Sequence, residues 1–182
     1  MGEITEPLAV LPLLAVTSRY PAALDWSRSR FESYFGPLQL TSPGFVFDQT
    51  EYYGATMGTD LYKWFLAPAG LGDPGDLCHW KHTTNAWEDD FNAAHEGAES
   101  RPLNLDPGSL AQDKLVLAST KNHAHRIYLA HGIYAEVTLH YQGGRWQSHD
   151  WTYPDFQRDD YHAFFTQCRD FFRRRATERD SP

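Results

Sequence analysis

Residues 104–150 constrain the fold more than any other stretch, because two glycine-containing turns divide their second half into a β-meander. A three-residue loop is expected at 130–132, because a two-residue loop there would exchange the two faces of the sheet. A two-residue loop at 143–144 then places Trp146 beside Tyr141. The strand between these loops should have one apolar face, formed by Ile133, Ala135, Val137, Leu139 and Tyr141.

The same register predicts where the polar residues of the meander lie. Ile127 faces Ala135, and Arg126 sits opposite Glu136, an arrangement in which opposite charges attract across two strands. Antiparallel sheets often have one solvated face. The second face of the meander is therefore either plain surface or one wall of a site, and it carries Arg126, Tyr128, Tyr134, Glu136, Thr138, His140, Gln147 and His149.

The rest of the chain alternates between apolar runs and helical patterns. Strands are expected in residues 8–16, 38–47, 61–67 and 101–105, with helices after Pro21 and Asp76. This β-α-β-β-α-β order is the ferredoxin-like one. A final amphipathic helix is predicted by the helical spacing of Tyr161, Phe164, Phe165, Cys168, Phe171 and Phe172.

The predicted fold class is therefore α+β: a ferredoxin-like half extended by a C-terminal antiparallel β-meander and a final amphipathic helix. No linker or repeat divides the chain, so we expect one domain over residues 1–182, with a frayed tail at 177–182.

Charge limits the classes of partner that the chain can bind, and cysteine content indicates its compartment. The net charge of −8 argues against nucleic acid and anionic membranes, whose binding needs a basic surface. No apolar run approaches the length of a membrane span, and the acidic start lacks the basic region of a signal peptide. Cys78 and Cys168 lie far apart without metal-type spacing, which suits a reducing compartment. We therefore expect a cytoplasmic protein without membrane or nucleic-acid partners.

Residues 119–126 form the densest polar cluster of the chain. Lys121, Arg126 and the hydroxyl of Ser119 offer the charge and short-range donors that bind a phosphate or a carboxylate. His125 or His123 could act as a general acid or base near neutral pH. The alternative is a solvated connection between a helix end and a strand, where such residues are also common.

Asp106 allows two interpretations. It either caps a helix that begins at Pro107, or it is a site carboxylate held at a turn. The two agree if the helix N-terminus also faces a ligand anion.

Several catalytic signatures are missing from the sequence. It contains no GxxxxGK[ST] phosphate loop, no GxGxxG, no GxSxG and no HExxH. His79 and His82 stand three residues apart but have no third ligand nearby, so no metal site is predicted. No cofactor is assigned.

Six segments carry a family resemblance: FVFDQTEYYGATMG, TTNAWE, NLDPGSL, KLVLASTK, HRIYLAHGIYAEVTL and WTYPDF. They resemble, in the same order, a bacterial family catalogued as domain of unknown function 4416. Some members of that family carry a GTP-binding label, which the missing phosphate loop does not support here. The resemblance implies a shared set of polar residues, namely Tyr53, Thr84, Asn85, Glu88, Asn104, Asp106, Lys114, Ser119, Lys121, His125, Arg126, Glu136 and Thr138.

The first functional hypothesis is a pocket for a small anionic molecule, such as a nucleotide or a phosphorylated metabolite. Lys114, Lys121 and Arg126 would hold the anion, while the acid–base or metal-binding groups would be Asp106, His125 and Glu136. Further ligand contacts would come from Tyr53, Asn85, Glu88, Asn104, Ser119 and Thr138.

Two alternatives belong to other functional classes. A non-catalytic interaction module would use the aromatic side chains of Tyr52, Tyr53, Trp151 and Tyr153. A metal-dependent hydrolase would need at least three converging ligands. The oligomeric state is not predicted.

Overall fold

The computed structural model describes residues 2–48 and 54–179 of the chain. Its elements are β1 (Leu11–Ser18), α1 (Pro21–Phe35), β2 (Leu38–Thr41), β3 (Phe45–Val46), α2 (Gly54–Met57), β4 (Tyr62–Pro68), η1 (Pro74–Asp76), α3 (Leu77–Ala94), β5 (Asn104–Leu110), β6 (Lys114–Ser119), β7 (Ile127–Ala130), β8 (Ile133–Gln142), β9 (Arg145–Ser148), η2 (Pro154–Gln157) and α4 (Asp159–Arg179).

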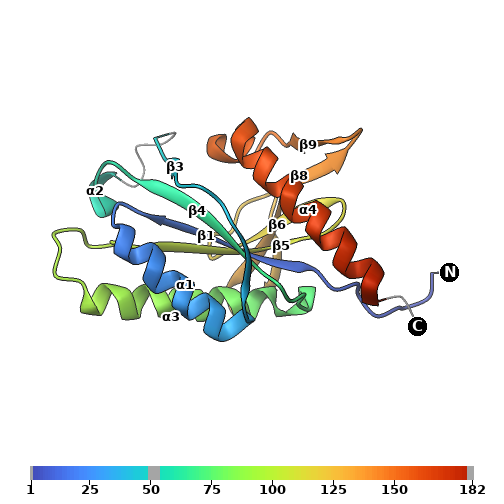
Figure 1. Cartoon of the computed structure of the whole chain (residues 1–182), viewed down its shortest axis with the longest axis horizontal. Helices are drawn as coiled ribbons and strands as arrows, with labels where there is room; N and C mark the ends of the chain where they lie inside the picture. The colour runs from blue at the N-terminus through green and yellow to red at the C-terminus, as the bar shows by residue number, and fades with distance from the viewer. Residues whose placement is uncertain (1, 49–53, 180–182) are drawn as a thin grey trace.

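In the described ranges the fold is mixed α+β, with one nine-stranded antiparallel sheet and four α-helices. The strand order is β2-β4-β1-β5-β6-β8-β7, with β3 beside β4 and β9 beside β8. Helices α1 and α3 lie on one side of the sheet and α4 on the other (Figure 1). The short elements β3 and α2 interrupt the simple β-α-β-β-α-β order that the sequence predicts. None of the helices described is long and apolar enough to cross a membrane.

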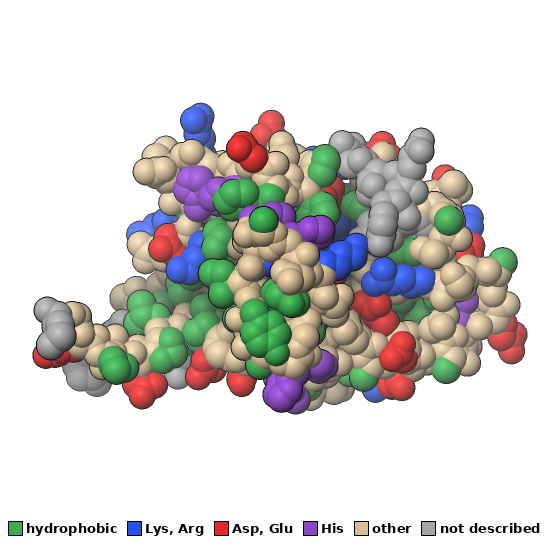
Figure 2. Space-filling model, turned by 180° about the vertical axis from the view of Figure 1, so that it is seen from behind, with side chains coloured by type: hydrophobic (Ala, Val, Ile, Leu, Met, Phe, Trp, Pro, Cys, Tyr) green, Lys and Arg blue, Asp and Glu red, His purple; other side chains and the backbone are tan. Residues whose placement is uncertain are grey.

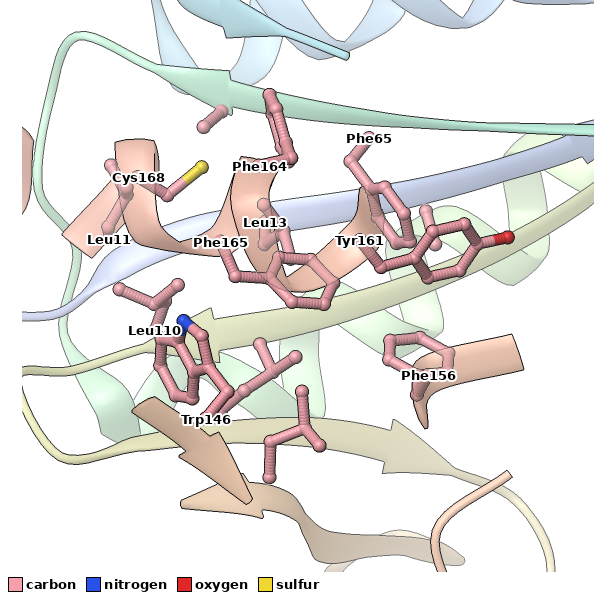
Figure 3. Close-up of a cluster of buried hydrophobic side chains, with 14 of the residues drawn as sticks. Leu11, Leu13, Phe65, Leu110, Trp146, Phe156, Tyr161, Phe164, Phe165 and Cys168 are labelled. Atoms are coloured by element: carbon pink, nitrogen blue, oxygen red, sulfur yellow. The ribbon is translucent and has the colours of Figure 1, made fainter. Parts of the chain in front are cut away.

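The core beneath α4 is aromatic. The predicted stripe of the last helix is confirmed, because all six of its residues are buried, Tyr161 and Phe165 completely so. Phe65 of β4 meets these two rings edge to face, at centroid distances of 4.9 Å (Figure 3). Edge-to-face packing of this kind adds to the burial of apolar area, so α4 is fixed to the sheet by ring contacts.

A second core lies between the sheet and helices α1 and α3. It contains Leu14, Phe31, Leu66 and Leu105, all fully buried. Helix α1 begins at Pro21, as the sequence predicts, and ends before Gly36. Gly36 has φ of 87°, a conformation that a glycine adopts without strain.

The meander has the predicted register but a different first loop. Ile127 pairs with Ala135, and Tyr141 pairs with Trp146, as expected. The three-residue loop at 130–132 is wrong: Ala130 pairs with Ile133 across a two-residue turn, and an irregularity between Tyr128 and Ala130 restores the register. The turn residues, His131 and Gly132, both have positive φ, which suits the twist of a tight hairpin.

The single apolar face predicted for the long strand is also wrong. The pairing between β6 and β8 shifts by one residue around Thr138, since Leu139 pairs with Leu115 but Val137 pairs with Val116. A bulge exchanges the faces of a strand on its two sides. Leu139 consequently joins the core beneath α4, whereas Ile133 packs in the cluster with α3, and Glu136 turns toward the α4 side.

Asp106 neither caps a helix nor stands at a turn, because Asp106, Pro107 and Gly108 lie inside strand β5. The helix expected to begin at Pro107 is replaced by the hairpin of β5 and β6. Asp106 pairs with Ala15 of β1, so its place is fixed by the sheet and not by a turn or a helix end.

Candidate functional site

The sheet splits between β5 and β6. The two strands are paired only where Gly108–Leu110 meets Leu115–Leu117, although β5 continues along β1 back to Asn104. Two residues set this boundary. A Cβ atom on Gly108 would lie 2.7 Å from the carbonyl oxygen of Val116, so glycine permits the close approach of the strands. Pro107 has no amide hydrogen with which to continue the ladder.

Helix α3 takes the place of the missing strand neighbour. The backbone N–H of Leu105 donates to Glu88 Oε1 at 2.7 Å, and its carbonyl accepts from Lys81 Nζ at 2.8 Å. Lys81 and Glu88 are seven residues apart, two turns of the same helix face. Burial raises the pKa of Glu88, although the charges of Lys81 and Arg101 oppose that shift. Polar side chains of α3 thus form the hydrogen bonds that the backbone of β5 would otherwise make with a neighbouring strand.

A cavity of about 390 Å³ lies at this split. Among the described residues, its charged lining consists of five cationic side chains (Lys63, Lys81, Arg101, Lys121, Arg126) and three carboxylates (Asp106, Glu136, Asp155). The remaining lining residues are Phe47, Asn104, Leu117, Ala118, Ser119, Thr120, Tyr153, Pro154 and Phe156. A volume near the lower end of the range of about 300–1,000 Å³ suits a small molecule.

Asp106 is the centre of one hydrogen-bond network in this cavity. It accepts from Lys81 Nζ at 3.1 Å and from Asn104 Nδ2 at 2.6 Å, and Arg101 in turn donates to Asn104 and Glu88. Burial raises the pKa of Asp106, but the charges of Lys81 and Lys63 and the two hydrogen bonds outweigh it, so the pKa lies below its usual value. The carboxylate is therefore ionised at neutral pH.

Arg126 is the centre of a second network. Its Nε–H donates to Glu136 at 2.8 Å, its Nη1 to Ser119 Oγ at 2.7 Å and to the Lys121 carbonyl at 3.1 Å, and its Nη2 to the Tyr153 hydroxyl at 2.9 Å. Four of the five guanidinium donors are thereby used within the chain. Burial lowers the pKa of Arg126, but hydrogen bonds to Glu136 and Tyr153 raise it above its ordinary value.

Lys63 and Asp155 form a third, more deeply buried pair. Their side chains are each 6% exposed, and Nζ lies 2.5 Å from Oδ2. The ammonium also lies 4.2 Å from the centroid of the Phe47 ring and 5.1 Å from that of Phe156. Aromatic faces attract a cation, so these rings help to hold the lysine in the cavity wall.

A column of stacked rings borders the site. His125 stacks on His123 and on Trp151, and Trp151 stacks on His149, with ring planes within 7° of parallel. Histidines gather beside β8 and β9 on the face seen in Figure 2. His125 links this column to the cavity, because its Nε2 lies 3.0 Å from Glu136 Oε2. Burial, followed by the charge of His140, lowers the pKa of His149.

The structure gathers most of the residues singled out in the sequence. Asn104, Asp106, Ser119, Lys121, Arg126 and Glu136 line the cavity. His125, Thr138 and Glu88 lie behind it, where Thr138 donates to Glu136 and Glu88 binds Arg101. Asn85 is half-buried on α3, one turn after Lys81.

Lys114 does not lie there. Lys114 is at the opposite end of β6 from Ser119, next to Asp113, and is not among the described residues that line the cavity. Tyr53 is outside the described residues, as is Tyr52.

Sequence reasoning missed Lys63, Lys81, Arg101 and Asp155, which supply much of the charge. Lys63 stands within an apolar strand, and Lys81 within a helix whose other buried positions are mostly apolar or aromatic. A charged residue on the inward face of an element is itself a signal of a site, because such residues are seldom buried unless paired. Lys63 lies two residues before Phe65 on the same strand and therefore on the same, buried face, so the alternation of the strand could have identified Lys63 as a site residue.

No set of three or more His, Cys, Asp or Glu side chains converges as a metal site within residues 2–48 and 54–179.

Comparison with known proteins identifies a family. A family described as Domain of unknown function (DUF4416) matches residues 9–172. No curated protein and no solved structure matches the chain.

Proposed function

The chain belongs to the DUF4416 family, and we propose that it binds a small anionic or phosphorylated molecule, such as a nucleotide, in the cavity at the sheet split. One observation carries the proposal. Five cationic side chains surround a single cavity in a chain whose net charge is −8. Lys63, Lys81 and Arg126 among them are buried, and taking charges out of water is costly unless they serve pairing or binding.

The proposed roles follow from the contacts. Among the described residues the second Nη2–H of Arg126 has no acceptor, and Lys121 lies beside it at the exposed edge of the cavity. Asp106 and Glu136 are the carboxylates that would face a bound molecule. His125 would exchange protons with the site through Glu136, and turnover, if it occurs, would use these three groups.

We also propose that β1, α1, β2, β4, α3 and β5 form a ferredoxin-like unit. The neighbouring order β2-β4-β1-β5 and the placement of both helices on one face support it. The proposed compartment is the cytoplasm, which the two free cysteines, Cys78 and Cys168, favour.

The second candidate function is a protein-interaction module. Trp151 and Tyr153 support it, because they are 40% and 44% exposed. Both are partly engaged within the chain, however: Trp151 donates to the carbonyl of Val137, and Tyr153 accepts from Arg126. A ligand in the cavity is the better-supported reading, since it accounts for the buried charges as well.

The experiment is a thermal-shift screen of the wild type and Arg126→Ala against nucleotides, sugar phosphates and divalent metals. A ligand that binds only the folded state raises Tm, by an amount equivalent to about 2.7 kcal/mol at a concentration 100 times Kd. Each shift is measured relative to the same variant without ligand, which removes the effect of the mutation on stability.

Arg145→Ala is the matched control, because Arg145 is exposed and outside the cavity lining. We expect an anion to raise the Tm of the wild type and of Arg145→Ala, and to raise that of Arg126→Ala much less. An absence of any shift in the wild type would contradict the proposal and favour a protein partner.

A further inference from the structure

Two histidines of the meander have ring nitrogens that face each other. His140 lies in β8, and His149 directly follows β9. The two strands are paired, with His140 opposite Gln147, so a diagonal contact between His140 and His149 is within reach of their side chains. Nδ1 of His140 lies 3.3 Å from Nε2 of His149. Both residues are half-buried, so solvent and small ions still reach them.

The distance between these two nitrogen atoms fits a shared metal ion. A tetrahedral zinc ion binds imidazole nitrogen at about 2.0–2.1 Å, so two such ligand atoms lie roughly 3.3–3.4 Å apart. The ring centroids of His140 and His149 are 4.7 Å apart, farther than the two nitrogen atoms. The nitrogen-bearing edges of the rings therefore lean toward each other, as they do when two imidazoles bind one ion.

Without a metal ion, the same contact is an N–H···N hydrogen bond. A neutral imidazole holds one proton on either of its nitrogens, and in this state one ring carries it on the nitrogen that faces the other ring. When a metal ion takes this place, the proton moves to the other nitrogen of its own ring. Both rings stay neutral, and both facing nitrogens then offer a lone pair to the ion.

The surrounding contacts hold His149 in position before any ion binds. Its ring stacks on Trp151 at a centroid distance of 4.6 Å, and Trp151 donates to the carbonyl of Val137 in β8. The backbone N–H of His149 donates to Thr152 Oγ1, which in turn donates to the carbonyl of Thr138. The second imidazole is thus tied to the strand that carries the first, and a site held in this way loses little freedom on binding.

The electrostatic surroundings also suit a cation. Burial, followed by the charge of His140, lowers the pKa of His149, which favours the neutral imidazole that a metal ion needs. The negative charges of Asp150 and Glu136 also act on His149, and they attract a bound metal ion as they attract a proton.

We propose that His140 and His149 form a binding site for a divalent transition-metal ion such as zinc, with Nδ1 of His140 and Nε2 of His149 as the protein ligands. No third His, Cys, Asp or Glu converges with them within the described ranges, so water takes the remaining positions. Imidazole nitrogen suits zinc, copper and nickel, whereas magnesium prefers oxygen ligands. Neither histidine is among the described residues that line the cavity, so this site is separate from the proposed anion site.

The test is an NMR titration of the untagged full chain, labelled with nitrogen-15, in which long-range correlations resolve the histidine ring nitrogens. We expect zinc chloride to shift Nδ1 of His140 and Nε2 of His149 together, and the change to be complete at one ion per chain. The seven other histidines of the nine in the sequence should respond only to excess zinc. Magnesium chloride should leave all of these nitrogens unchanged.

Variants measure the contribution of each ligand by isothermal titration calorimetry. His140→Gln and His149→Gln should each weaken zinc binding at least tenfold. His123→Gln is the matched control, because His123 belongs to the same group of stacked rings but contacts His125 and not the proposed ligands. It should bind zinc as the wild type does.

Each alternative outcome overturns the proposal in a different way. Zinc shifts that appear first at other histidines would place the site elsewhere. A loss of affinity in only one of the two ligand variants, or in neither, would contradict a site built by both imidazoles. No saturable shift at all would mean that the contact between the two rings is a hydrogen bond and nothing more. The proposed anion cavity is tested separately and stands or falls by its own screen.

Discussion

The two ends of the sheet face beneath α4 have opposite chemistry. At one end, Phe65 packs against the aromatic rings of α4 and is fully buried. At the other end, Lys63, two residues earlier on the same strand and the same face, is also buried but pairs with Asp155. Strand β5 repeats the change, from Leu110 in the core to Asp106 in the cavity. On each strand, two to four residues thus separate the apolar core from the charged cavity.

The difference has a physical origin in the sheet. Where β5 and β6 are paired, the sheet is continuous and α4 covers it with rings. Where they diverge, Lys81 and Glu88 must satisfy the backbone of Leu105, and charged side chains surround the opening. The apolar end stabilises the fold, whereas buried ion pairs contribute little net stability and are retained chiefly where they serve specificity or binding.

Truncating the apolar end should have the largest effect on stability. Phe165 is completely buried among aromatic rings, so Phe165→Ala should lower the free energy of unfolding by about 4 kcal/mol. Urea denaturation followed by fluorescence measures it. Ile127→Ala is the control, because Ile127 is 70% exposed and its loss should change stability by about 0.5 kcal/mol or less. A small loss in Phe165→Ala would mean that this end is not the stabilising one.

Breaking one charged pair at the other end should come next. Asp155→Ala leaves the Lys63 ammonium buried without its carboxylate, at a cost of about 3 kcal/mol. The double variant Lys63→Met with Asp155→Leu should be more stable than Asp155→Ala, because no uncompensated charge is left. Equal losses in the single and double variants would show that the pair itself stabilises the fold.

Pushing β5 and β6 apart where they are paired should lower the stability by a smaller amount. Gly108→Ala places a methyl group 2.7 Å from the Val116 carbonyl oxygen and should destabilise the chain by about 2 kcal/mol. Gly54→Ala is the control, because a Cβ atom there meets nothing within 4 Å. Thermal unfolding measures both variants. If Gly108→Ala unfolds at the wild-type Tm, close strand contact does not set the boundary of the cavity.

The smallest effect is expected from a charged contact outside the cavity. A hydrogen bond from Tyr20, followed by one from Arg19, lowers the pKa of Glu99 to about 2 from 4.5. Because the pKa is lower in the folded state, the stabilisation is complete above pH 4.5 and is lost as pH falls toward 2. The difference in stability between wild type and Glu99→Gln should therefore shrink across this window. A difference that stays constant with pH would contradict this assignment.

The sequence predicts local structure well where the hydrophobic spacing of a helix or the residues of a tight turn determine it. The stripe of α4, the start of α1 at Pro21 and the turn at 143–144 follow from spacing and turn chemistry. Prediction from the sequence fails where contacts between distant segments determine the local structure. A bulge at Thr138 exchanges the faces of β8, and Asp106-Pro107-Gly108 forms a strand because β1 pairs with it. Pro107 and Gly108 look like a turn signal, but here they set the limit of strand pairing.

The site could be predicted only in part for the same reason. Residues 119–126 and Glu136 are close in sequence, and their contacts follow from the hairpin. Lys63, Lys81 and Asp155 come from three distant segments, and only the folded chain brings them to Asp106 and Arg126. Lys63 and Lys81 stand at inward positions of largely apolar elements, but the sequence alone does not show which distant groups they meet.

The most direct test of the account is a nitrogen-15 NMR titration of the whole chain with phenyl phosphate, because amide shifts report on both ends of the sheet at once. We expect the largest shifts at the split, for the amides of Asn104, Leu105 and Ser119, with the amides of Leu110 and Leu115 at the paired end nearly unchanged. Shifts confined to the paired end, or no shifts at saturating ligand, would contradict the claim that the divergence of β5 and β6 builds an anion-binding site.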